Sequence, residues 1–189
     1  MKKIIGLMTT LLCFQTIASA GNFKTVEQVD LEKYIGRWYE IASIPQSFQK
    51  QCVSDTTAEY QVNADGTIQV INSCATKSGE RSIAKGRAKV VNTETNAELK
   101  VTFVHLFGHW IYTFGGGYYV VGLGQNYEYA IVGHPSFEYA WILSRTPQLD
   151  AVTLNDIDIQ LKNLGYDSCA LKITPQKGGF SEVKDFCKR

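Results

Sequence analysis

The amino-acid sequence predicts an all-β protein, an antiparallel up-and-down barrel of about eight strands with one C-terminal α-helix packed on the outside. Three observations support this fold class. Apolar and polar residues alternate in one segment after another between residues 38 and 144. Only short breaks separate these segments, and none of the breaks carries a helical pattern. After Arg145, apolar residues recur at helical spacing instead.

Length and composition are those of an ordinary globular protein with one domain. The chain has 189 residues, of which 44% are hydrophobic and 20% are charged. Its formal net charge is +1, and Lys and Arg occur singly rather than in clusters. Nucleic-acid binding needs a clustered basic face, so we do not expect a nucleic acid as a partner.

The first 20 residues are predicted to be a signal peptide, which leaves residues 21–189 as a single mature domain. Lys2 and Lys3 form a positive start, residues 4–14 form an apolar stretch, and residues 18–20 read Ala-Ser-Ala, a small-residue cleavage site. The apolar stretch is shorter than the ~20 residues that a membrane-spanning helix needs. We therefore expect an exported protein, periplasmic or secreted.

Cysteine usage agrees with export. Cys13 lies in the leader and follows Leu11 and Leu12, whereas lipoprotein processing wants a small residue there, so we do not expect lipidation. The four cysteines that remain suit disulfides in an oxidising compartment, and four cysteines allow three pairings: Cys52, Cys74, Cys169 and Cys187. Their spacing does not fit a zinc site.

The strands are expected in the following order. Residues 58–62 and 67–70 alternate around a polar turn at 63–66, which predicts a hairpin. The other segments with strand character are residues 38–44, 86–90, 99–103, 118–123, 127–133 and 137–144. Neighbouring strands joined by short turns pair antiparallel, and closure into a barrel removes the exposed edges of the sheet. The barrel is expected to span about residues 36–145.

A single amphipathic helix follows, at about residues 150–164. Leu154, Ile157, Leu161 and Leu164 lie on one helical face, and Gly165 suits the helix C-terminus. The tail that follows, to residue 189, is predicted to be extended.

A barrel of this size can hold one small ligand if its inward residues leave room. Ala58, Gly86 and Ala88 are small, whereas Tyr60 and Phe103 are bulky. Each apolar residue alone is better explained by core packing than by a cavity.

The sequence shows no catalytic motif. It lacks a G-x-S-x-G elbow, the glycines at 115–117 lack the Lys-Ser/Thr of a phosphate loop, and His105 and His109 lack the Glu and the helix of a zinc protease. With three His in the chain, we expect no metal, no cofactor and no enzymatic activity.

Three motifs carry a family resemblance. "GRWYE" at 36–40, "NYEYAIVG" at 126–133 and "YAWILSRTP" at 139–147 resemble, in order and spacing, the three signature regions of the lipocalins. The similarity is greatest to the bacterial outer-membrane lipocalins and apolipoprotein D, and it covers nearly all of the mature chain.

The resemblance implies a barrel, closed at one end, that carries a small hydrophobic ligand. In the bacterial branch it implies a fatty acid or lysophospholipid, stored or transported for maintenance of the envelope; a pigment, haem or siderophore carrier is the alternative. It also implies that Gly36 and Trp38 lie at the closed end, with Arg145 across the indole. The residues expected to line the cavity and its mouth are Glu40, Ala58, Tyr60, Val70, Ala88, Val101, Phe103, Trp110, Tyr112 and Tyr129.

The segment 106–117 reads "LFGHWIYTFGGG" and is longer and more aromatic than the family pattern. Its aromatic residues either pack on one another in a hairpin or form a lip that contacts the ligand or a membrane surface. A peripheral membrane contact is thus one expected interaction. The chain is expected to be a monomer or a homodimer.

Two disulfide pairings stay open. Cys52 and Cys74 flank the first hairpin near the open end, which favours that pair, together with Cys169 and Cys187. The resemblance to apolipoprotein D implies instead that Cys52 pairs with Cys187. Either pairing is expected to stabilise the fold by about 3 kcal/mol for each disulfide.

Overall fold

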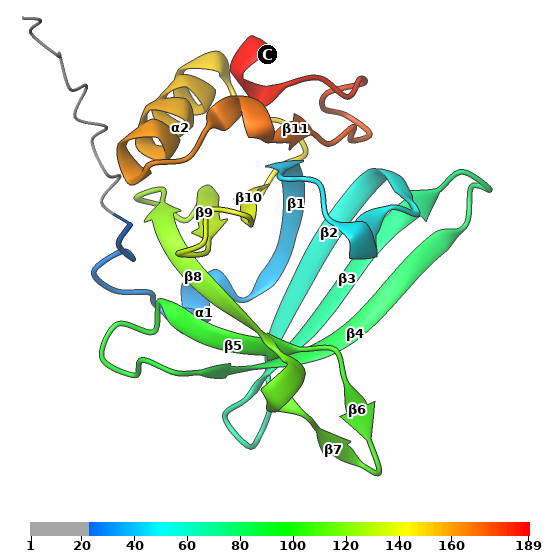
Figure 1. The fold of residues 1–189 in the computed structure, drawn as a ribbon, viewed down its shortest axis with the longest axis vertical. Helices are drawn as coiled ribbons and strands as arrows, with labels where there is room; N and C mark the ends of the chain where they lie inside the picture. Colours follow the sequence, from blue (N-terminus) through cyan, green and yellow to red (C-terminus); the bar gives the residue numbers. More distant parts are fainter. Residues whose placement is uncertain (1–22) are drawn as a thin grey trace, which may run out of the picture.

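The computed structural model describes residues 23–189, which form an antiparallel barrel with a helix and the C-terminal segment on one side of it (Figure 1). The predicted signal peptide, including Cys13, lies outside the described residues. The strands are β1 (Gly36–Ser43), β2 (Cys52–Val62), β3 (Ile68–Thr76), β4 (Arg81–Val90), β5 (Glu98–Thr102), β6 (His105–Leu106), β7 (His109–Trp110), β8 (Gly116–Leu123), β9 (Tyr129–Gly133), β10 (Ala140–Ser144) and β11 (Lys172–Ile173). The helices are α1 (Leu31–Tyr34) and α2 (Ala151–Leu164), with short 3-10 turns η1 (Ser47–Gln49), η2 (Tyr112–Phe114), η3 (Ser168–Ala170) and η4 (Phe186–Lys188).

The barrel wall runs β1-β2-β3-β4-β5-β8-β9-β10, and every neighbouring pair is antiparallel. The last strand closes the barrel, because β10 pairs with β1 from Tyr39 opposite Ser144 to Ser43 opposite Trp141. The eight-stranded up-and-down barrel predicted from the sequence is thereby confirmed. Closure pairs the first strand of the wall with the last one, and β4 is unpaired with β5 before Arg87.

Two strands begin later than the alternation predicts. Strand character was expected from residues 127 and 137, but Tyr127 and Phe137 have φ values of 60° and 59°. Their N–H groups donate to the carbonyls of Gly124 and His134, so both residues belong to turns. An aromatic residue in the left-handed region is uncommon, and alternation of residue types does not reveal it.

Helix α2 lies on the outer wall, as predicted (Figure 1). Asp150 caps its first turn by accepting from the N–H of Thr153, and Gly165 ends it with a φ of 99°. Besides Asp158, its buried residues are Leu154, Ile157, Leu161 and Leu164, and these four join one apolar cluster with outward residues of the barrel.

The C-terminal segment is part of the wall rather than a free tail. Strand β11 pairs with Ala42 and Ser43 of β1. Just after it, the carbonyl of Pro175 accepts from the N–H of Asp55 of β2. Since β1 and β2 pair only from Gly36 to Tyr39 on the β1 side, this segment fills the gap where the two strands diverge.

The structure contains the disulfides Cys52–Cys74 and Cys169–Cys187, with Cα–Cα distances of 5.4 Å and 4.9 Å. This is the pairing favoured by strand position, and the pairing of Cys52 with Cys187 is wrong. The first disulfide ties β2 to β3, and the second ties η3 to η4.

Candidate functional site

The closed end of the barrel is held by Arg145 and Trp38. The guanidinium carbon of Arg145 lies 3.7 Å from the indole centroid of Trp38, a close cation–π contact. The same guanidinium donates hydrogen bonds to the carbonyls of Lys33, Tyr34 and Arg37. Gly36, at φ 92°, makes the turn between α1 and β1. The three residues that the resemblance placed at the closed end therefore lie together there.

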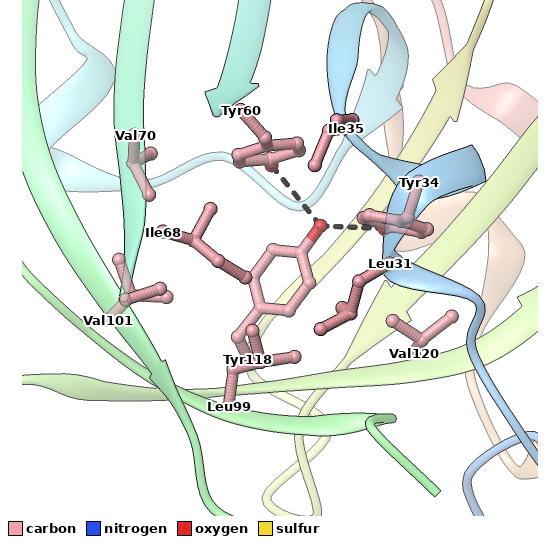
Figure 2. Close-up of a pocket in the computed structure, with 11 residues that line it drawn as sticks. Leu31, Tyr34, Ile35, Tyr60, Ile68, Val70, Leu99, Val101, Tyr118 and Val120 are labelled. Carbon is pink, nitrogen blue, oxygen red and sulfur yellow. Dashed lines mark hydrogen bonds between the residues drawn. The ribbon is translucent and has the colours of Figure 1, made fainter. Parts of the chain in front are cut away.

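A cavity lies inside the barrel above this end (Figure 2). It encloses about 20 Å³, room for about one water molecule. Apart from three tyrosines, its lining is aliphatic. The lining residues are Leu31, Tyr34, Ile35, Tyr60, Ile68, Val70, Ala88, Leu99, Val101, Tyr118 and Val120.

The three tyrosines meet at their hydroxyl groups, as Figure 2 shows. The Tyr118 hydroxyl is 2.8 Å from that of Tyr34 and 3.2 Å from that of Tyr60. Burial raises the pKa of Tyr60 to about 12 and raises the pKa values of Tyr34 and Tyr118 further. All three side chains are therefore neutral phenols at physiological pH.

The inner face of the barrel continues beyond this cavity to Gly86 and Phe103. Gly86 faces inward, since it pairs with the cavity-lining Val70. A Cβ on Gly86 would come within 2.8 Å of the Phe103 ring, so the absence of a side chain at residue 86 makes the space that Phe103 occupies. Phe103 is still 46% exposed, so this part of the barrel is open to solvent.

Glu40 lies buried where β1 and β2 diverge. Its carboxylate accepts hydrogen bonds from the hydroxyls of Ser43 and Thr174 and from the amide of Gln49. Burial raises the pKa of Glu40, and these three donors partly oppose that rise. The Gln49 amide oxygen also accepts from the indole N–H of Trp141, at 3.4 Å. This network presents polar groups next to the apolar interior.

The structure brings four of the ten predicted ligand-site residues together around the cavity. Tyr60, Val70, Ala88 and Val101 line the cavity. Ala58 pairs with Trp38 at the closed end, Phe103 lies beyond the cavity, and Glu40 is satisfied by its neighbours.

Trp110 and Tyr112 lie outside the barrel, contrary to the expectation. The Trp110 ring packs 5.6 Å from the Arg87 guanidinium, and the Tyr112 ring packs 4.8 Å from the Lys89 ammonium. Arg87 and Lys89 flank the cavity-lining Ala88, so they point to the outer face of β4. These two cation–π contacts hold the aromatic segment against the outer face of β4.

Tyr129 also points away from the cavity. Its hydroxyl accepts from the amide of Gln160 on α2, at 2.7 Å, and its ring belongs to the cluster beneath the helix. Its neighbour Ala130 packs with Trp38 on the inner side. The prediction that Tyr129 lines the cavity is therefore wrong, because alternation shows that neighbouring residues face opposite sides but not which of them faces inward.

Seven of the eleven cavity residues were not predicted from the sequence: Leu31, Tyr34, Ile35, Ile68, Leu99, Tyr118 and Val120. Helix α1 has 4 residues, which is too short for a helical pattern of apolar residues to be recognised in the sequence. Tyr118 had a signal, because it alternates with the inward Val120 in the predicted strand.

Comparison with known proteins identifies the family. The model of the lipocalin-like domain matches residues 29–176. The chain belongs to the lipocalin family. This lipocalin is 38% identical to temperature-induced lipocalin-1 of Arabidopsis thaliana, over 81% of this chain and 82% of the relative. It is 36% identical to outer membrane lipoprotein Blc of Vibrio cholerae, over 94% of this chain and 100% of the relative.

A solved structure supports the same fold. Insecticyanin from the tobacco hornworm Manduca sexta matches with a TM-score of 0.66 at 22% identity, covering 87% of this lipocalin and 94% of insecticyanin. Within residues 23–189, no helix is both long and apolar enough to cross a membrane. The same residues hold no group of three or more His, Cys, Asp or Glu placed to bind a metal ion.

Proposed function

We propose that this lipocalin binds a fatty acid or a lysophospholipid in its barrel and stores or transports it for maintenance of the bacterial envelope. The observation that carries the proposal is the aliphatic cavity at the closed end. The inward residues Gly86 and Phe103 lie next to its lining residue Val70. Burial of an acyl chain contributes about 0.8 kcal/mol per CH₂ group. As contacts to the headgroup we propose the Gln49 amide and the Trp141 indole N–H, which in this structure hydrogen-bond to Glu40 and to each other.

Titration of the delipidated protein with a fluorescent fatty acid tests the proposal. We expect saturable binding that hexadecanoic acid and a lysophospholipid displace. If neither lipid displaces a saturably bound probe, the proposal is wrong. A coloured or iron-containing protein after native purification would instead indicate a pigment, haem or siderophore carrier.

The proposed role is that of a carrier without enzymatic activity. Its support is that lipocalins are generally binders. Incubation of the loaded protein, followed by mass spectrometry of the extracted ligand, should return the ligand unchanged. A product that accumulates with time would contradict this role.

We further propose that the protein is exported, to the periplasm or beyond, and contacts membranes peripherally. Two disulfides suit an oxidising compartment, and one relative is named an outer membrane lipoprotein. Phe107 and Phe114, near the β6–β7 hairpin, are 98% and 73% exposed, and Phe48 of η1 is also exposed. Cell fractionation and vesicle sedimentation test these two statements, and light scattering distinguishes a monomer from a homodimer.

A further inference from the structure

The three tyrosine hydroxyls form a bar across the barrel. Tyr118 is on β8 and Tyr60 is on β2, and these strands are opposite one another in the barrel order, with three strands between them on each side. Tyr34 joins them from α1, at the closed end, where its ring lies 5.1 Å from that of Trp38. A chain entering from the open end would therefore meet hydroxyl groups at the bottom of the cavity, not hydrocarbon.

The three hydroxyl groups do not satisfy one another's hydrogen bonds completely. Three neutral phenols carry three hydroxyl protons, and two hydroxyl–hydroxyl hydrogen bonds use two of them. Whichever hydroxyl donates in each bond, one proton is left without an acceptor among residues 23–189. The surrounding side chains, among them Ile68, Leu99 and Val120, are aliphatic and offer no acceptor. Both hydrogen bonds are partly buried, and a donor that is removed from water without a partner costs about 1–3 kcal/mol.

The space beside the hydroxyls fits one small group. The cavity volume of about 20 Å³ corresponds to one water molecule or one terminal hydroxyl or carbonyl group. A neutral oxygen suits the site better than a carboxylate, since the lining residues carry no positive charge.

We propose that the hydroxyls of Tyr34, Tyr60 and Tyr118 form a binding subsite for a neutral oxygen at the far end of the ligand, a hydroxyl or keto group on the end of an acyl chain. This inference rests on the proposed function and narrows its ligand class to oxygenated acyl chains. The ligand oxygen accepts the unpaired phenol proton. A terminal hydroxyl also donates its own proton to a phenol oxygen.

The test compares hexadecanoic acid with 16-hydroxyhexadecanoic acid, each as a competitor of a fluorescent fatty acid. A shorter pair, dodecanoic and 12-hydroxydodecanoic acid, allows for chains that do not span the barrel. The measured quantity is the ratio of the two dissociation constants within a pair. In the variant Tyr34→Phe/Tyr60→Phe/Tyr118→Phe, the shape of the cavity is kept and all three hydroxyls are removed together. We expect the ratio to shift against the hydroxy acid by at least about tenfold, since its hydroxyl is then buried without a partner.

Tyr119→Phe is the matched control. Tyr119 is the next residue of β8, its side chain packs with the outer cluster, and its hydroxyl makes no hydrogen bond with the residues that the structure describes. We expect the wild-type ratio in this variant. A crystal structure of the wild-type protein with 16-hydroxyhexadecanoic acid provides a measurement independent of any variant, and the terminal oxygen should lie within hydrogen-bond distance of a phenol.

The outcomes separate the two proposals. If both acids of a pair bind and their ratio is the same in wild type and triple variant, the subsite is wrong and the carrier function stands. A crystal structure with the carboxylate at the tyrosines, or with water retained there, also overturns the subsite. If no acid of either pair binds, the proposed function fails and the subsite fails with it.

Discussion

Replacing Arg145 by Lys tests whether the closed end depends on the shape of the guanidinium group rather than on its charge. Arg145 stacks on Trp38 at 3.7 Å and reaches three backbone carbonyls, those of Lys33, Tyr34 and Arg37. A cation–π contact contributes about 1–2 kcal/mol, and a hydrogen bond from a charged donor about 1.5–3 kcal/mol. Lys keeps the charge but not the planar fork.

The size of the effect follows from those contacts. Lys is expected to reach one of the three carbonyls and to lose the stacking. Because Arg145 is partly exposed, we take the low end of each range for the stack and for the two lost hydrogen bonds, and expect Arg145→Lys to lower the free energy of unfolding by about 4 kcal/mol. At about 2–4 °C per kcal/mol for a chain of this size, Tm should fall by about 8–16 °C. Urea unfolding followed by tryptophan fluorescence measures both wild type and variant.

Arg37→Lys is the matched control. Arg37 makes an exposed ion pair with Glu59, at 3.6 Å, and its side chain is 59% exposed. Such pairs contribute little, so the control should lie within about 0.5 kcal/mol of wild type. Equal stabilities of Arg145→Lys and Arg37→Lys would refute the reasoning, because the fork and the stack would then contribute nothing measurable.

Three further predictions follow from the interior and the C-terminal segment. Burial raises the pKa of Glu40 above its ordinary value of 4.5, so the native state binds this proton more tightly than the unfolded state does. The wild-type protein therefore loses stability as the pH rises above about 4.5. The free energy of unfolding of Glu40→Gln minus that of wild type should therefore increase with pH from about 4.5 upward; a difference that is flat with pH contradicts the shift. Gly86→Val places atoms where the Phe103 ring lies and should weaken fatty-acid binding at least about tenfold while the protein still melts cooperatively; unchanged affinity would show that the ligand does not reach this level. Replacing Cys169 and Cys187 by Ser should lower the free energy of unfolding by about 3 kcal/mol in urea titrations. Reductant opens both disulfides of the wild type, so a variant that loses more stability than the reduced wild type would contradict this prediction.

The barrel could be predicted from the sequence because each strand buries one face, which leaves a period of two in the residue types. Family resemblance supplied the contact between Trp38 and Arg145, which are 107 residues apart and share no local pattern. Alternation was not sufficient for the orientation of a strand, and Tyr129 was placed on the wrong face for that reason.

The rest of the site depends on contacts that leave no periodic trace. The aromatic residues Trp110 and Tyr112 were expected near the ligand. Instead, they pack against two cations on the outer face of β4. Nothing in the order of residues predicts that Thr174 reaches Glu40, since the two are 134 positions apart. The tyrosine bar combines residues from α1, β2 and β8, and only the folded barrel shows that their hydroxyls meet.

The segment after β11 has a consequence for how the protein is made. Gln176 donates to the backbone carbonyls of Glu40 and Thr56, and so joins the first two strands at the level where they part. The rim of the barrel therefore contains both an early and a late part of the chain. A ribosome or a translocation pore that still holds the last few dozen residues also withholds this piece of the wall. We expect the barrel to acquire its ability to retain ligand only after the whole polypeptide has been released.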